Sequence, residues 1–144
     1  GFVGDVEKVN TVLLETLLRQ DIAPVFSAIT HDGQGQLLNT NADTIASEIA
    51  TSLAKKHQVK LYFCFDKKGV LMDADDPSTL VPLINEDIFK KLLNDQVIHS
   101  GMIPKLENAF NALDKGVSNV WMGLPENLLL ASKGENAGTI IGSK

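Results

Sequence analysis

Two hydrophobic periods alternate along this chain, and their alternation limits the folds open to it. Helical stripes, in which apolar residues recur every three or four positions, are separated by short runs of β-branched and aromatic residues. The order is helix, strand, loop, helix, strand, loop, two helices, strand, helix and strand. Such an order implies βαβ crossovers. We therefore expect an α/β fold, a three-layer αβα sandwich around a mostly parallel sheet.

The helical pattern occurs in five segments. They are residues 5–19, a segment beginning near residue 41 and ending near residue 56, residues 85–94, a segment with Pro104 in its first turn and Gly116 just past its end, and residues 126–132. In the second of them Ala46, Ala50 and Ala54 form a stripe of small side chains. This stripe predicts a helix that lies close to the sheet.

Four segments are predicted to be strands: residues 23–29, 59–65, 117–122 and 139–141. The first contains Pro24, which we place at the start of the strand because proline donates no ladder hydrogen bond. Residues 31–36 contain Asp-Gly and a second glycine, which indicates a hairpin or loop. Cys64 and Trp121 fall inside or at the end of strands, so we interpret both as packing residues.

Composition narrows the class of protein. The 144 residues suit one domain, of which 44% are hydrophobic and 22% charged. A net charge of −5 argues against a nucleic-acid partner, because such proteins usually carry a basic field. The single cysteine excludes an internal disulfide and fits a cytoplasmic location. No apolar run reaches the roughly 18–20 residues that span a bilayer, so we expect no membrane contact.

The first of three polar clusters is Asn39-Thr-Asn-Ala-Asp43, where a loop becomes a helix. Asn39 or Asn41 can cap that helix, and Asp43 falls in its first turn, where the helix dipole favours a carboxylate. Two interpretations stay open. The residues cap the helix and do nothing more, or they line a polar pocket at the edge of the sheet, where open α/β sheets bind ligands.

The other two clusters also have a plain structural interpretation beside the functional one. Residues 65–70, Phe-Asp-Lys-Lys-Gly-Val, follow a predicted strand and fit either a β-turn or a nucleotide-docking loop. Residues 99–105 place a glycine before a helix start that carries Lys105. A helix start with an ammonium is a natural anion site, but a lysine is also usually a solvated surface residue. The three histidines match no metal-ligand spacing, so no metal site is predicted.

Taken in order, these clusters resemble the amino acid kinase family. The likeness rests on Leu38-Asn-Thr-Asn-Ala-Asp-Thr-Ile-Ala46, Asp66-x-x-Gly-Val-Leu71, Ser100-Gly-Met-Ile-Pro-Lys105, Gly138-Thr139 and the opening segment 1–10. It covers essentially the whole chain. The first and third motifs are those of the family members that phosphorylate N-acylated glutamate.

The resemblance implies that residues 1–144 form a single lobe, the C-terminal ATP-binding half of a chain about twice as long. The N-terminal lobe, with its Lys-x-Gly-Gly phosphate loop, second glycine-rich loop and substrate-binding arginine, is absent. The whole enzyme would use ATP with Mg²⁺ to phosphorylate the side-chain carboxylate of N-acetyl-L-glutamate, or another N-acylglutamate, in arginine biosynthesis. It would be a homo-oligomer, and this half alone would have little activity.

Site roles follow from the resemblance position by position. Asn39 and Asn41 would bind the acylglutamate, Asp43 would organise the active-site lysines, and Lys105 would stabilise charge on the transferring phosphoryl group. Lys105 and Asp43 should therefore converge on one small volume beside the sheet. The nucleotide would be held by Asp66, Lys67, Lys68, Gly69, Val70 and Leu71, with Val97, Ile98 and His99.

Two residues depart from the family pattern in the nucleotide loop. Phe65 stands where a small hydroxyl residue is usual, and Lys67 stands where a valine is usual. Two alternatives therefore stay open. The chain could be a non-catalytic nucleotide-binding or regulatory module, or part of a sister kinase that acts on aspartate, glutamate or a nucleoside monophosphate.

Overall fold

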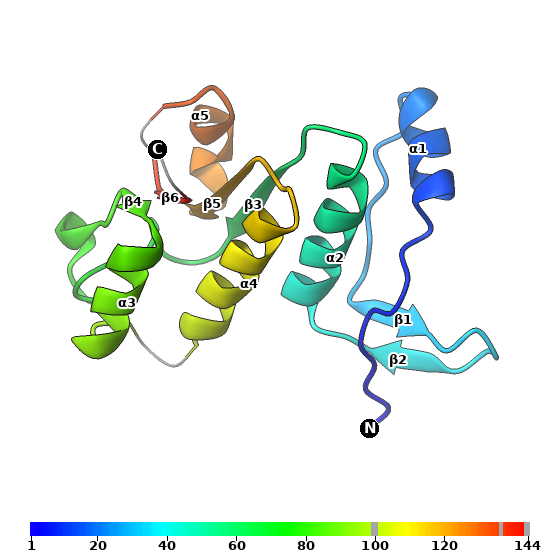
Figure 1. Ribbon diagram of the computed structural model, residues 1–144, viewed down its shortest axis with the longest axis horizontal. Helices are drawn as coiled ribbons and strands as arrows, with labels where there is room; N and C mark the ends of the chain where they lie inside the picture. Colours follow the sequence, from blue (N-terminus) through cyan, green and yellow to red (C-terminus); the bar gives the residue numbers. More distant parts are fainter. Residues whose placement is uncertain (99–100, 136, 143–144) are drawn as a thin grey trace.

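The computed structural model describes residues 1–98, 101–135 and 137–142 (Figure 1). Two short 3₁₀ turns, Pro77–Thr79 and Pro125–Asn127, accompany the main elements. The helices and strands are α1 Thr11–Arg19, β1 Ile29–His31, β2 Leu37–Asn39, α2 Ala42–Ala54, β3 Lys60–Cys64, β4 Leu83–Ile84, α3 Glu86–Asn94, α4 Ile103–Asp114, β5 Asn119–Gly123, α5 Leu128–Ser132 and β6 Thr139–Ile141.

Four strands form the main sheet in the order β3-β5-β6-β4. The pairs β3–β5 and β4–β6 are parallel, whereas β5–β6 is antiparallel. The predicted α/β fold with a mostly parallel sheet is thus confirmed. The antiparallel pair arises because the chain turns back through α5 directly into the neighbouring strand.

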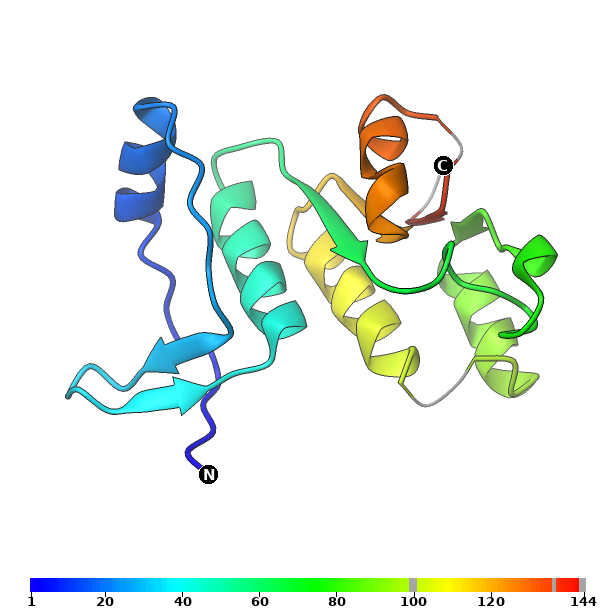
Figure 2. The same ribbon diagram turned by 180° about the vertical axis from the view of Figure 1, so that it is seen from behind.

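Helices cover both faces of this sheet. Both views show α4 on one side of β5 and β6 and α5 on the other (Figures 1 and 2). On the α2–α4 face, the predicted small-residue stripe of α2 packs into the core, and Ala109 and Ala112 of α4 are fully buried. Small side chains allow both helices to approach the sheet closely. The largest fully buried side chains are Ile84, Leu106, Met122, Ile141, Val70, Val120 and Thr139.

Trp121 is buried on the opposite face of the sheet, as predicted, and it lies 5.9 Å from Tyr62 between ring centroids. A Cβ added at Gly123 or at Gly138 would lie 2.5 Å from the indole ring. Only glycine therefore fits at these two positions, and the backbone itself covers the tryptophan.

The prediction that Cys64 packs in the core is wrong, because its side chain is exposed. Strand β3 is an edge strand, and Cys64 alternates with the buried Phe63, which faces the helices. Partial burial still raises the pKa of the Cys64 thiol, which disfavours a reactive thiolate.

The segment before α2 differs from the sequence prediction. Residues 23–28 form no strand, and β1 begins only at Ile29, where it pairs with β2 as an antiparallel hairpin. Val25 is 95% exposed, and within the described residues no strand pairs with residues 23–28, of which residues 24–28 line a pocket with Ile45 and Ile49 of α2. The turn predicted at residues 31–36 is confirmed, since it joins the two strands of the hairpin.

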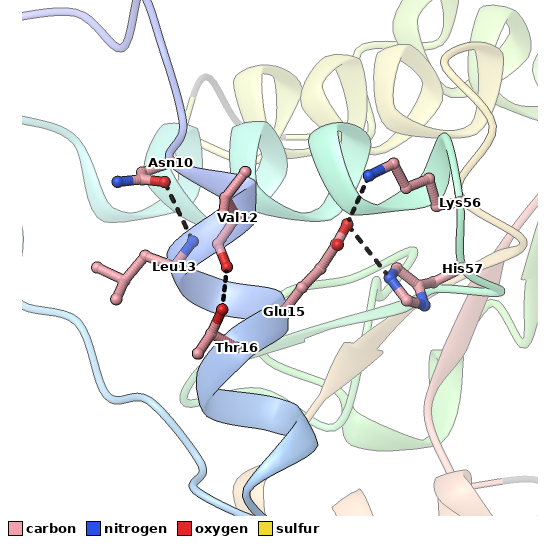
Figure 3. A network of polar contacts seen from close by, with 7 residues as sticks. All are labelled: Asn10, Val12, Leu13, Glu15, Thr16, Lys56 and His57. Atoms are coloured by element: carbon pink, nitrogen blue, oxygen red, sulfur yellow. Dashed lines mark hydrogen bonds and ion pairs between the residues drawn. The ribbon is translucent and has the colours of Figure 1, made fainter.

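Helix α1 begins at Thr11 and not at residue 5, because the Asn10 side chain caps it by accepting from the Leu13 N–H. Figure 3 shows how Glu15 then ties this helix to the end of α2. Its Oε1 lies 3.2 Å from the Lys56 Nζ and 3.7 Å from the His57 Nε2. The hydrogen bond from Lys56 holds the pKa of the Glu15 carboxyl below its ordinary value of 4.5.

Candidate functional site

The N-terminal ends of α2 and α4 lie at the same side of the sheet (Figure 1). Helix α2 is capped by the Asn41 Oδ1, which accepts from the N–H groups of Asp43 and Thr44. Helix α4 has Pro104 in its first turn and no side-chain cap within the described ranges. The positive ends of two helix dipoles therefore lie close together.

Lys105 and Asp43 meet at this corner, as the sequence predicted. The Lys105 Nζ donates a hydrogen bond to the Asp43 Oδ2, and the two side chains are 29% and 28% exposed. A lysine in the first turn of a helix is opposed by the dipole, so the neighbouring carboxylate compensates the local charge. The pair leaves a partly buried lysine that also lines the neighbouring cavity.

A cavity of about 260 Å³ adjoins Lys105. Its walls are largely apolar, and Val70, Leu71 and Ile98 are buried in them. The lining residues are Phe65, Asp66, Lys67, Gly69, Val70, Leu71, Ala74, Val97, Ile98, Gly101, Met102 and Lys105. A largely apolar lining that also carries Asp66, Lys67 and Lys105 suits a ligand with a flat apolar part and a charged part.

Most residues predicted to hold a nucleotide line this cavity. The exceptions are Lys68, which is exposed and does not line it, and His99, which lies outside the described residues. Three lining residues, Ala74, Gly101 and Met102, were assigned no role from the sequence. The Ala74 carbonyl oxygen accepts a hydrogen bond of 3.2 Å from the Lys67 Nζ, which links Ala74 to another residue of the cavity lining. The sequence carries no signal for this contact.

The two predicted substrate residues lie apart from the cavity. Asn39 ends β2, and its backbone groups bond to Phe2 and Gly4, while its side chain is exposed. The Oδ1 of Asn41 serves as the cap of α2, so the capping interpretation holds for that atom. Thr40, which lies between these two residues in the sequence, is buried, and its hydroxyl oxygen lies 2.7 Å from the Thr30 hydroxyl oxygen in a hydrogen bond.

Within residues 1–98, 101–135 and 137–142, no group of three or more histidine, cysteine, aspartate or glutamate side chains could hold a metal ion. In the same ranges no helix has the length and apolar character needed to cross a bilayer.

The sequence profile described as the amino acid kinase family matches residues 1–123 of this chain. A curated relative named acetylglutamate kinase, from Phocaeicola vulgatus, is 50% identical over 141 residues, covering 98% of this chain and 53% of the relative. A relative of the same name from Parabacteroides distasonis is 54% identical over 120 residues, covering 83% and 47%. The chain therefore belongs to the amino acid kinase family, and it spans about half the length of the curated relatives it matches.

Solved structures match the fold of this chain. The crystal structure of smu.665 from Streptococcus mutans UA159 matches all of this chain and 52% of its own, with a TM-score of 0.78 and 31% identity. The N-acetylglutamate synthase from Neisseria gonorrhoeae, complexed with coenzyme A and L-arginine, matches 100% of this chain and 33% of its own, with a TM-score of 0.84. At 22% identity the synthase supports the fold alone.

Proposed function

We propose that this chain is the nucleotide-binding lobe of an enzyme that transfers a phosphoryl group from ATP to the side-chain carboxylate of an N-acylglutamate, with N-acetyl-L-glutamate as the first choice. The observation that carries the proposal is the Lys105–Asp43 pair beside an apolar cavity. The name acetylglutamate kinase, borne by relatives about 50% identical, supports the acceptor and the place in arginine biosynthesis.

In this proposal the apolar part of the cavity, which includes Val70, Leu71 and Ile98, takes the adenine ring. Asp66, exposed at the rim, accepts from a ribose hydroxyl. The phosphates then extend toward Lys105 and the start of α4, where an ammonium and the positive end of a helix dipole favour anions. Mg²⁺ enters with the ATP phosphates.

The chemistry suits such a site. A carboxylate acceptor is ionised at neutral pH, so the reaction needs no strong general base. The acceptor and the γ-phosphate are both anionic and repel one another, and positioned cations compensate that charge as it redistributes in the transition state. Asp43 keeps the Lys105 ammonium in place, while Asn39 and Asn41 are the proposed contacts to the acylglutamate.

The rest of the enzyme would complete the site. The phosphate loop, the acylglutamate loop and the substrate arginine belong to the other half of the relatives' length, which would also take part in a homo-oligomer. Residues 1–40 also carry several large apolar side chains that are each more than half exposed, among them Phe2, Val25, Phe26, Ile29 and Leu37. In the proposed enzyme these side chains contact the other half or another subunit.

The test joins this chain to the N-terminal half of the Phocaeicola vulgatus relative. With ATP, Mg²⁺ and N-acetylglutamate, the joined protein should form an acyl phosphate that hydroxylamine traps, whereas the 144-residue chain alone should form little. A folded joined protein that forms no acyl phosphate with any N-acylglutamate would refute the proposal. Robust turnover by this chain alone would show that the other half is not needed.

A non-catalytic nucleotide-binding module is the second candidate, because both departures from the family pattern, Phe65 and Lys67, line the cavity. Calorimetry separates it from the first: binding of an ATP analogue without turnover in the joined protein would favour the module. Turnover with aspartate, glutamate or a nucleoside monophosphate, and not with N-acylglutamate, would instead indicate a sister kinase.

A further inference from the structure

The Gly138-Thr139 motif has no role in the proposed function, yet Thr139 is one of the most deeply buried polar residues of the chain. It opens β6, an inner strand of the sheet, and its exposed fraction is 0%. A hydroxyl buried to this extent is stable only when its hydrogen bonds are satisfied.

Both hydrogen bonds of the Thr139 hydroxyl reach segments far away in the sequence. The Oγ1 accepts from the Val70 N–H at 2.8 Å and donates to the Val81 carbonyl oxygen at 2.7 Å. The Val81 N–H in turn donates to the Val70 carbonyl oxygen at 2.8 Å. Three residues thus close a ring of hydrogen bonds, and one of them, Val70, is a wall of the cavity.

Close packing brings the glycine of the Asp-x-x-Gly motif onto this ring. A Cβ added at Gly69 would lie 2.5 Å from the Thr139 Oγ1 and 2.6 Å from the Leu80 Cδ1. Gly69 therefore makes room for the contact between its own loop and the threonine. Gly138, which precedes the threonine, packs against a different residue, because a Cβ there would lie 2.5 Å from the indole of Trp121.

We infer that Thr139 is a positioning residue for the nucleotide: its hydroxyl fixes the backbone of Val70, and with it Leu71, as one wall of the cavity. Thr139 itself does not line the cavity, so it acts through Val70 and not by contact. The identity of the ligand in this inference rests on the proposed function.

Three variants of the joined protein test this role. Thr139→Val keeps the shape of the side chain but leaves the Val70 N–H and the Val81 carbonyl without a partner, whereas Thr139→Ser keeps the hydroxyl. The matched control is Thr51→Val, because Thr51 is also buried, at 6% exposed, and its hydroxyl donates within its own helix, to the Glu48 carbonyl oxygen. Each variant is titrated with a non-hydrolysable ATP analogue, and the KM values for ATP and N-acetylglutamate are measured.

For Thr139→Val we expect the Kd of the analogue and the KM for ATP to rise about tenfold, with the KM for N-acetylglutamate within about twofold of its original value. Thr139→Ser should restore nucleotide binding, and Thr51→Val should leave it unchanged. Original affinity in a folded Thr139→Val variant would overturn the inference. So would an equal loss in Thr51→Val, or a failure of serine to restore binding.

A measurement on the unchanged protein covers the case in which Thr139→Val does not fold. The Val70 amide proton should exchange with solvent more slowly than those of its neighbours in residues 66–71, because its acceptor is buried. Fast exchange of this proton would overturn the inference. If the unchanged protein binds no ATP analogue at all, the proposed function fails, and the inferred role in nucleotide positioning fails with it.

Discussion

Replacing Lys105 with methionine separates the chemical role of the ammonium from its role in the fold. Methionine keeps an unbranched side chain with good helix propensity. The lost ion pair is about one-third exposed, so it contributes roughly 0.2–1 kcal/mol to stability. The helix dipole opposes a lysine in the first turn by roughly 0.3–1 kcal/mol, which its removal relieves. The two effects offset, and we expect the free energy of unfolding to change by less than about 1 kcal/mol.

Turnover should respond very differently. Removing one positioned donor that compensates transition-state charge lowers kcat about 10²–10³-fold, which corresponds to about 2.7–4 kcal/mol. The KM for ATP should change little, because most of the cavity surface is apolar wall and not ammonium. The assay is hydroxamate formation in the joined protein, alongside thermal unfolding of the same sample.

Lys115→Met is the matched control. Lys115 caps the other end of α4, and its Nζ lies 3.6 Å from the Glu48 Oε1 of α2, so it links the same two helices. Because it lies away from the cavity, its loss should leave kcat unchanged. Full turnover in Lys105→Met, or an equal loss in Lys115→Met, would refute the reasoning.

Three further outcomes are expected. Gly69→Ala should lower both the Tm and the affinity for the ATP analogue, since its Cβ would meet the Thr139 Oγ1 at 2.5 Å; unchanged values would contradict this packing. Leu106→Ala, at a fully buried position, should destabilise the fold by about 2–5 kcal/mol in urea unfolding. The pKa of Glu15 is lowered by Lys56, so Glu15 stabilises the fold above pH 4.5 and loses this effect as pH falls through the lowered pKa. The Tm difference between the unchanged chain and Glu15→Gln should therefore be present at pH 7 and vanish in acid.

Local patterns were sufficient for most helices and strands of the main sheet region. The stripes of α2, α3 and α4 and the β-branched runs of β3, β5 and β6 were predicted within a few residues, because each pattern is complete within its own segment. The very short β2 and β4 were missed, because no β-branched run marks them and their strand character depends on their pairing.

The errors at residues 23–28 and at Cys64 share one cause. An apolar run is compatible with a strand, but a strand forms only where a partner offers its backbone groups. Cys64 is exposed because β3 lies at the edge of the sheet. No single segment of the sequence encodes which strand lies at the edge.

By itself the sequence determined the α/β class, the helices whose N-termini carry Asp43 and Lys105, and the loop residues that line the cavity, because periodicity, capping and short motifs act over a few neighbouring residues. The tertiary structure made the Lys105–Asp43 contact that the family resemblance implied, and it alone decided that Ala74 lines the cavity and that Thr139 hydrogen-bonds to Val70. Those contacts join segments far apart in the chain, and their geometry depends on how the strands pair and how closely the helices pack against them.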